Sequence, residues 1–353
     1  MQRTLKPILD RKIRFALVGC GRIAKNHVSA LDQLSHDCEL VDICDVNAAA
    51  LGSLSQKVKA NHHENISDML HKTTADCVIL TTPSGLHPEQ TILAAQSMKH
   101  VITEKPMALH LNDGLQMVEA CQNAEVTLFV VKQNRHNPTL EKLKRAIIND
   151  RFGRICSVAV NVFWTRPQEY YDSATWRGTW KFDGGALMNQ ASHYVDLLDW
   201  LIGPVESVMA YTGTLLRDIE VEDSAAVALN WKNGALGTIN VSMLTHPKNL
   251  EGSITIIGET GTVKVGGIAL NEILHWEFAN HEVEDAEVQN VNYEARNVYG
   301  NGHFRYYNKV IDFLRGKKVV VTDGGEGLKS LELLIAMYSS ATHGRRVFLP
   351  LEN

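Results

Sequence analysis

The sequence Phe15-Ala16-Leu17-Val18-Gly19-Cys20-Gly21-Arg22-Ile23-Ala24 decides the fold, because a short apolar run ends there on two glycines. This pattern predicts a buried strand that enters a phosphate-binding turn and then a helix. Gly19 permits the tight turn, Gly21 lets the backbone approach a pyrophosphate, and Ala24 allows close helix packing. The helix begins near Arg22 and directs free N–H groups at that pyrophosphate. A plain strand-to-helix connection is the alternative interpretation.

A carboxylate follows the next predicted strand, which ends at Cys44. Asp45 lies 26 residues after Gly19, close to the spacing of roughly 20 residues at which an acidic side chain binds the ribose hydroxyls of NAD. Its charge would repel the 2′-phosphate of NADP, and no arginine follows it to receive that phosphate. The sequence therefore favours NAD as cofactor, with a loop cap as the alternative role of Asp45.

Length and composition predict a soluble protein of two domains. The 353 residues exceed what one hydrophobic core usually serves, and 44% of them are apolar. The formal net charge is −5 and no basic run occurs, which argues against a nucleic-acid partner. No stretch approaches the ~20 apolar residues of a membrane span, and residues 1–14 lack the apolar region of a secretory signal. The six cysteines form no C-x-x-C pair, so we expect reduced thiols in a cytoplasmic enzyme without a metal site.

Strand and helix patterns alternate up to about residue 150 and then change. Residues 1–150 therefore predict an α/β Rossmann domain with a doubly wound parallel sheet, which binds NAD. From residue 151 to 353, alternating apolar and polar residues predict an α+β domain with a mainly antiparallel sheet, which binds substrate. Helical patterns near 306–314 and 328–338 close the chain, and these last helices are free to pack back on the first domain.

Two stretches carry residues suited to catalysis, and we expect them where the two domains meet. Lys105, in Glu104-Lys105-Pro106 at the end of a predicted parallel strand, is suited to donate to a substrate hydroxyl as negative charge develops on its oxygen. A glycine-led helix over 183–200 carries Asn189 and His193, which are four residues apart and so share one face. An exposed lysine and a structural histidine are the ordinary alternatives.

Together these motifs resemble the glucose-fructose oxidoreductase/inositol dehydrogenase (Gfo/Idh/MocA) family over the whole chain. The strings at 131–135, 164–171, 176–180 and 188–194 are longer and more specific, and they are similar to its branch of WlbA-type UDP-N-acetyl-2-amino-2-deoxyglucuronate dehydrogenases. The resemblance implies NAD-dependent oxidation of the sugar C3 hydroxyl to a ketone, in the biosynthesis of a diacetamido uronic acid of surface polysaccharide or lipopolysaccharide O-antigen. It also implies a cytoplasmic homotetramer that assembles through the sheets of the second domain.

The resemblance implies three groups of site residues. Catalysis falls to Lys105 and His193. The cofactor contacts are Gly19, Gly21, Arg22, Ile23, Asp45, Thr82, Pro83, Ser84, His87, Glu104, Lys105 and Gln133. The substrate contacts are Lys105, Asn134, Arg135, Arg166, Tyr170, Trp176, Arg177, Asn189 and His193. Many relatives carry an aspartate where this chain has Asn189, so the catalytic role of that aspartate is not transferred.

Several questions stay open at this level. Arg135, Arg166 and Arg177 are all suited to bind a carboxylate or a diphosphate, and any of them can equally be a structural ion-pair partner. Either His193 or Lys105 can be the final proton acceptor. The route of NADH reoxidation, by exchange or by a second substrate such as 2-oxoglutarate, is undetermined, as is the acyl group accepted at C2. A dehydrogenase of a free sugar or inositol, and a non-catalytic NAD-binding regulator, are the alternative functions.

Overall fold

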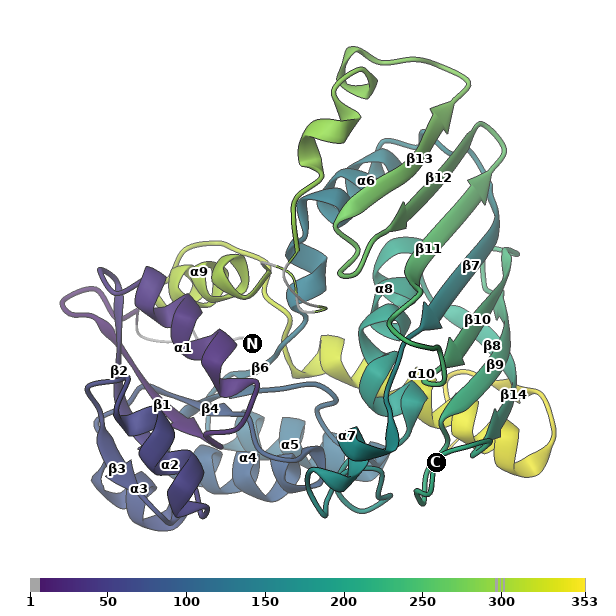
Figure 1. Ribbon diagram of the computed structural model, residues 1–353. Helices are drawn as coiled ribbons and strands as arrows, with labels where there is room; N and C mark the ends of the chain where they lie inside the picture. The colour runs from purple at the N-terminus through teal and green to yellow at the C-terminus, as the bar shows by residue number, and fades with distance from the viewer. Residues whose placement is uncertain (1–6, 296–297, 299, 301, 353) are drawn as a thin grey trace. The chain divides into compact units, whose positions relative to one another are not determined.

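The computed structural model describes residues 7–295, 298, 300 and 302–352 (Figure 1). The part of the N-terminal extension in residues 1–6 lies outside this range. Two compact units divide the chain: the first holds residues up to 131 together with 303–328, and the second holds 132–302 and the residues from 329 onward. The predicted boundary at residue 150 therefore falls inside the second unit. The segment before residue 150 belongs to that unit because Asn137 and Thr139 hydrogen-bond to the carbonyl groups of Ala269 and Leu270.

The first unit is a Rossmann domain, as the sequence predicts. Its six parallel strands lie in the order β3-β2-β1-β4-β5-β6. The strands are β1 (Ile13–Val18), β2 (Cys38–Cys44), β3 (Asn61–His63), β4 (Cys77–Leu80), β5 (His100–Thr103) and β6 (Leu128–Val130). The strand order reverses between β1 and β4, and ligands of such sheets bind beyond the carboxyl ends of the strands at that point.

Helices of the first unit pack on this sheet through a continuous apolar core. They are α1 (Ala24–Gln33), α2 (Ala48–Ser55), α3 (Ile66–Lys72), α4 (His87–Gln96), α5 (Leu111–Asn123) and α9 (Gly302–Leu314), the last from residue 303 onward. Phe15 of β1 meets Tyr307 of α9 edge to face, with ring centroids 5.8 Å apart. Tyr307 and Val310 are fully buried in the same core as the strands, so a helix near the end of the chain completes the first unit.

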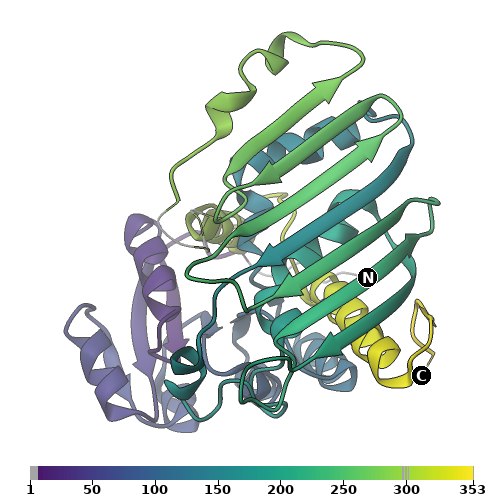
Figure 2. The same ribbon diagram turned by 45° about the vertical axis from the view of Figure 1, so that its right-hand side comes forward.

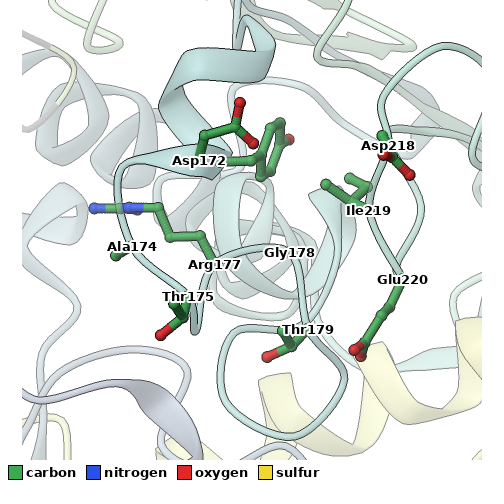
Figure 3. A pocket seen from close by; sticks show the side chains of 10 residues that line it. Asp172, Ala174, Thr175, Arg177, Gly178, Thr179, Asp218, Ile219 and Glu220 are labelled. Carbon is green, nitrogen blue, oxygen red and sulfur yellow. The ribbon is translucent and has the colours of Figure 1, made fainter.

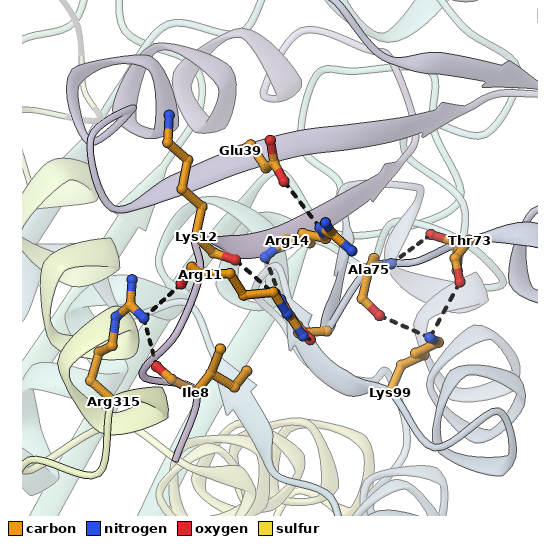
Figure 4. Close-up of polar contacts among 10 residues, drawn as sticks. Ile8, Arg11, Lys12, Arg14, Glu39, Thr73, Ala75, Lys99 and Arg315 are labelled. Atoms are coloured by element: carbon orange, nitrogen blue, oxygen red, sulfur yellow. Dashed lines mark hydrogen bonds and ion pairs between the residues drawn. The ribbon is translucent and has the colours of Figure 1, made fainter. Parts of the chain in front are cut away.

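The segment before β1 is held at two places (Figure 4). The guanidinium of Arg315, just after α9, donates to the carbonyl oxygens of Ile8 over 2.6 Å and of Arg11 over 2.7 Å. Arg11 pairs with Asp76 through two contacts of 2.7 Å, and the backbone N–H of Arg14 also donates to Asp76. These contacts fix the entry of β1 against α9 and the turn before β4.

The second unit contains an eight-stranded sheet in the order β13-β12-β11-β7-β10-β9-β8-β14 (Figure 2). Its strands are β7 (Ile155–Phe163), β8 (Val205–Gly213), β9 (Ser224–Trp231), β10 (Leu236–Ser242), β11 (Glu251–Gly258), β12 (Gly261–Gly266), β13 (Glu272–Phe278) and β14 (Val347–Phe348). Every neighbouring pair is antiparallel except β7 and β10, which run parallel. The prediction of a mainly antiparallel sheet is confirmed. The parallel pair is possible because a long stretch of chain connects β7 to β10.

Helices cover one face of this sheet (Figures 1 and 2). They are α6 (Pro138–Ile148), α8 (Ser192–Ile202) and, from residue 329 onward, α10 (Gly324–His343). The short α7 (Gln168–Asp172) lies in the segment that connects β7 to β8. Along β9, Val227 and Leu229 are buried and Ala226 and Ala228 are exposed, which is the alternation of a sheet covered on one side. No helix among the described residues is long and apolar enough to cross a membrane.

Candidate active site

The glycine turn after β1 has the geometry that a dinucleotide requires. Gly19 has a φ of +95°, and a Cβ there would lie 2.7 Å from the backbone carbon of Thr81. Only glycine therefore permits the turn at this point. A Cβ at Gly21 would meet nothing within 4 Å, so the space over the turn is open. Arg22 is exposed, and Ile23 precedes α1 without a side-chain cap, so the first N–H groups of α1 have no side-chain acceptor there.

Asp45 lies beside this turn at the end of β2, where the sequence predicts it. Its Oδ2 accepts the backbone N–H of Cys20 over 2.6 Å, and its Oδ1 accepts that of Asn47 over 2.8 Å. The half-buried carboxylate thus joins the end of β2 to the glycine turn, and lone pairs remain for further donors. The open turn and the neighbouring carboxylate fit a pyrophosphate and a ribose diol.

The turn after β4 carries Thr82, Pro83 and Ser84. The Thr82 hydroxyl donates to Gln90 over 2.6 Å, which ties the turn to α4. His87 is 1% exposed, and its ring nitrogens lie 3.0 Å from the carbonyl oxygens of Thr82 and Pro106. Burial lowers the pKa of His87 despite these two carbonyl groups. Its ring therefore links this turn to the segment that follows β5, which is a positioning role.

The carboxylate of Glu104, at the end of β5, lies in a buried network that the sequence does not predict. Its Oε1 is 2.9 Å from Nε2 of His27, whose Nδ1 is 2.6 Å from the hydroxyl of Tyr307. Burial opposes ionisation of Glu104, but the contacts with His27 and His303 outweigh it and hold the pKa of the carboxyl well below its usual range. Burial lowers the pKa of His27, so a neutral His27 donates from Nε2 to an ionised Glu104.

The same network bears on Lys105 and on metal binding. The backbone N–H of Lys105 donates to Glu104 Oε2 over 3.1 Å, so the network fixes the chain at the half-buried Lys105. Potential ligand atoms of His27, Glu104 and His303 lie within 4.8 Å of one another. The hydrogen bond between His27 and Glu104 would have to be replaced for an ion to enter, because both atoms would become ligands.

In the second unit, the short helix Gln133–His136 brings a side chain to the candidate base, His193. The side-chain nitrogen of Gln133 lies 3.1 Å from Nε2 of His193, which is 6% exposed. The Oε1 of Gln133 and the Oδ1 of Asn134 are buried and have no hydrogen-bond partner among the described residues. These two amide oxygens, one of them on the side chain that contacts His193, are suited to receive donors from a ligand.

The guanidinium of Arg135 is held by a buried carboxylate. This guanidinium forms a two-pronged pair with Asp196, with two contacts of 2.8 Å, and lies over the ring of Trp200. Lys132 adds a second cation 3.4 Å from Asp196. Burial raises the pKa of Asp196, but the two cations outweigh it and the pKa is lowered. This is the structural ion-pair role that the sequence leaves open for Arg135, and its contact with the substrate stays a prediction.

The predicted helix over 183–200 is not continuous. A π-helical turn runs from Ala186 to Gln190, with the N–H of Ala191 bonded to the carbonyl of Ala186 over 2.8 Å, and α8 begins only at Ser192. Asn189 and His193 therefore lie on different elements, so their spacing of four does not place them on one α-helical face. Such π turns are often found at functional sites. The side chain of Asn189 donates to the buried carboxylate of Asp183.

Arg166 and Arg177 both lie against the ring of Tyr170, in the segment that connects β7 to β8. The guanidinium of Arg166 lies 5.3 Å from the ring centre of Tyr170, and that of Arg177 lies 4.4 Å from it. Arg177 also donates to the Tyr170 hydroxyl over 2.7 Å and stacks on Trp176 at 4.5 Å. Neither arginine forms an ion pair with an acidic side chain of the described residues. Of the three candidate arginines, these two have guanidiniums without a carboxylate partner.

A cavity of about 390 Å³ adjoins this cluster (Figure 3). Its walls are the segment from Tyr171 to Thr179 and the segment from Asp218 to Glu220. In the close-up, the guanidinium of Arg177 extends to the side opposite Asp218 and Glu220. The charged side chains of the lining are thus the guanidinium of Arg177 and the three carboxylates of Asp172, Asp218 and Glu220.

Sequence reasoning missed several residues that shape the site. They are buried or half-buried groups that act through another residue: His27, Lys132, Asp183, Glu222, His303 and Tyr338. Their only signal in the sequence is that each carries a polar or charged side chain. Such a signal identifies neither the partner nor the role.

Models of known families match most of the chain. The model described as "Oxidoreductase family, NAD-binding Rossmann fold" matches residues 13–132, and "Oxidoreductase family, C-terminal alpha/beta domain" matches residues 144–349. A myo-inositol 2-dehydrogenase from Thermotoga maritima is 28% identical over 65% of this chain and 68% of its own length.

Two solved structures are far more similar. The WlbA dehydrogenase of Chromobacterium violaceum is 61% identical, with 99% of each chain covered and a TM-score of 0.94. The WlbA dehydrogenase of Bordetella pertussis is 59% identical over 98% of this chain and 100% of its own, with a TM-score of 0.95. Both were solved in complex with NADH and UDP-GlcNAcA.

Proposed function

The chain belongs to the Gfo/Idh/MocA oxidoreductase family, and on this premise we propose that it is an NAD-dependent dehydrogenase of UDP-N-acetyl-2-amino-2-deoxy-D-glucuronate. Two relatives of about 60% identity bind NADH and UDP-GlcNAcA. The residues of the glycine turn and Asp45 fit the diphosphate and ribose of NAD. When bound, NAD supplies the acceptor for a hydride.

One observation supports an anionic nucleotide sugar as the substrate. Arg166 and Arg177 present two guanidiniums around Tyr170 without any carboxylate partner in the described chain. A uronate and a diphosphate provide the planar anions that such forks bind. A neutral free sugar or inositol would leave this positive charge unmatched, which disfavours the first alternative function. The aromatic ring of Trp176 beside Arg177 offers a flat surface for a base or a sugar.

For the reaction, we assign His193 as the proton acceptor from the C3 hydroxyl and Lys105 as a donor to the same oxygen. Removal of the proton as the hydride leaves avoids a free alkoxide. To act as this proton acceptor, the His193 ring has to be neutral before the reaction. Asn189, which is itself held by Asp183, orients the sugar through hydrogen bonds.

The 3-keto uronate is suited to a later transamination, so we place the enzyme in the biosynthesis of a diacetamido uronic acid of surface polysaccharide or O-antigen. We also propose a cytoplasmic homotetramer. Apolar side chains on the sheet of the second unit support this assembly: Tyr211 is 70% exposed, Leu236 61% and Leu274 53%.

The test is NADH formation with a panel of UDP-N-acetylglucosamine, its C6 uronate, free N-acetylglucosamine and myo-inositol. We expect turnover of the uronate and a kcat/KM at least tenfold lower for UDP-N-acetylglucosamine, because its neutral C6 hydroxyl leaves a guanidinium unpaired. Lys105→Met and His193→Asn should remove most turnover, and His193→Asn should leave NAD binding nearly intact. NAD binding without turnover of any substrate would favour the non-catalytic regulator. Efficient turnover of inositol would favour the alternative dehydrogenase.

A further inference from the structure

Glu222, two residues before the start of β9, is attached to the π-helical turn that leads to His193. It is 3% exposed. Its backbone carbonyl accepts the N–H of Ala186 over 3.0 Å, and its Oε1 accepts the N–H of Leu187 over 2.8 Å. A Cβ at Gly185 would lie 1.7 Å from Glu222 Oε2. Only a glycine therefore lets the carboxyl reach the start of the turn.

The described hydrogen-bond partners of this carboxyl are all uncharged groups. The hydroxyl of Tyr338 on α10 donates to Oε1 over 2.8 Å and also accepts the N–H of Met188. The other oxygen, Oε2, is buried without a hydrogen-bond partner, and no lysine, arginine or histidine of the described chain pairs with Glu222. A buried carboxylate with one oxygen unpaired is costly unless it holds a proton.

The other titratable groups that face Glu222 do not favour its charge. Asp223, next to it in the chain, accepts backbone N–H groups from Leu215, Leu216 and Arg217, and the pKa of Asp223 is lowered despite partial burial. Asp223 is therefore ionised and repels a second negative charge. Burial raises the pKa of Tyr338 well above its ordinary value, so its hydroxyl stays neutral. Burial, opposed by the hydrogen bonds from Leu187 and Tyr338, raises the pKa of Glu222 to about 7.

We propose that Glu222 is a positioning residue that must carry a proton to hold the π-helical turn, and with it Asn189 and His193, in the active arrangement. The proposal rests on the proposed function only in taking Asn189 and His193 as site residues. Ionisation would leave a charge on Oε2 against the backbone of Gly185 and near Asp223. Water entry or a shift of the turn would relieve this charge, and either change displaces the residues that follow.

The kinetic test compares pH profiles of the full-length enzyme with NAD and the UDP-uronate. Above about pH 7, kcat/KM of the unmodified enzyme should fall. Glu222→Gln has a neutral amide of the same shape, so it should retain activity and lose this alkaline decrease, while Glu222→Ala should reduce kcat at least tenfold at every pH. Glu277→Gln, an exposed glutamate on β13 with the same charge change, is the matched control and should keep the unmodified profile. Glu222→Gln that keeps the alkaline decrease, or that is as inactive as Glu222→Ala, overturns the proposal.

A stability measurement separates this proposal from the identity of the substrate. The pKa of Glu222 is raised from 4.5 to about 7 in the folded protein, so the unmodified protein loses stability relative to Glu222→Gln as the pH rises from 4.5 to 7 and no further above it. The Tm of the unmodified protein should therefore fall relative to that of Glu222→Gln over that interval. Above it, the difference between the two Tm values should stay constant. If the uronate is not turned over but this difference appears, the proposed substrate fails and the protonated Glu222 stands. A difference in Tm that does not vary with pH overturns the protonated carboxyl.

Discussion

The side-chain nitrogen of Gln133 lies 3.1 Å from Nε2 of His193. An amide nitrogen donates and does not accept, so in this contact Nε2 of His193 is the acceptor. Gln133→Glu puts a carboxylate at the same atom and favours the protonated ring. We expect the acidic limb of the kcat/KM profile to move up by about one pH unit. Gln133→Met, which has similar size and no charge, is the control, and an unmoved limb in Gln133→Glu would show that the two side chains do not interact in solution.

The contact between Asn189 and Asp183 predicts the effect of a charge at position 189. The sequence alone predicts that Asn189→Asp raises the pKa of His193. In the structure the new carboxylate would face Asp183, which is 1% exposed and also accepts the N–H of Gly178 over 2.8 Å. We therefore expect Asn189→Asp to lower the free energy of unfolding by about 1–3 kcal/mol at pH 7, and by less at pH 5. Urea unfolding at both pH values measures this, and an equal loss at the two would contradict charge repulsion.

Substitutions of Arg135 and Arg177 should have different effects. The first should lower the stability of the protein, and the second should weaken substrate binding. Arg135→Met removes the two contacts of the guanidinium with the buried Asp196 and leaves the more distant Lys132, so we expect a loss of about 3 kcal/mol in the free energy of unfolding. Arg177→Met breaks no ion pair in the described chain and should change this free energy little. It should raise KM for the uronate at least tenfold while KM for NAD is unchanged. If Arg135→Met were stable and selectively impaired in uronate binding, the assignment of the two arginines would be reversed.

Asp45 should determine the choice between the two dinucleotides. Asp45→Ser removes the charge that repels a 2′-phosphate, so NAD should bind more weakly and its advantage over NADP should narrow. The loss of the acceptor for Cys20 and Asn47 should also lower the free energy of unfolding by about 1 kcal/mol. Asp45→Asn keeps an oxygen acceptor and loses the charge, so it isolates the electrostatic part. Equal kcat/KM with NAD and NADP in the unmodified enzyme would remove this role of Asp45.

The pair of Glu104 and His27 should make the protein sensitive to acid. The pKa of Glu104 is held well below its ordinary value of 4.5 in the folded state. Its contribution to stability is therefore present above the unfolded value and is lost as the pH falls below 4.5 toward the folded value. Glu104→Gln should be less stable than the unmodified protein at pH 7, and the difference should shrink in acid. Thermal unfolding between pH 3 and 7 measures it, and a constant difference would mean that Glu104 is not ionised in the folded protein.

The sequence determined the elements that depend on neighbouring residues. The glycine turn, the helix after it and Asp45 at the end of the next strand are all as predicted. Their geometry follows from backbone freedom at Gly19 and from local patterns of apolar residues. The alternation of apolar and polar residues likewise predicts the mainly antiparallel sheet of the second unit, because side chains of a strand alternate between its faces.

Only the tertiary structure decided which polar groups become partners. Arg135 is bound by Asp196, and His27 meets Tyr307, which lies 280 positions away in the chain. The break of the predicted helix into a π-helical turn and α8 also depends on a distant group, since Glu222 holds the start of that turn. The physical reason is that a buried charge must find an opposite charge, a hydrogen bond or a proton. Which of these it finds depends on the strands and helices that pack around it, and not on the residues beside it in the sequence.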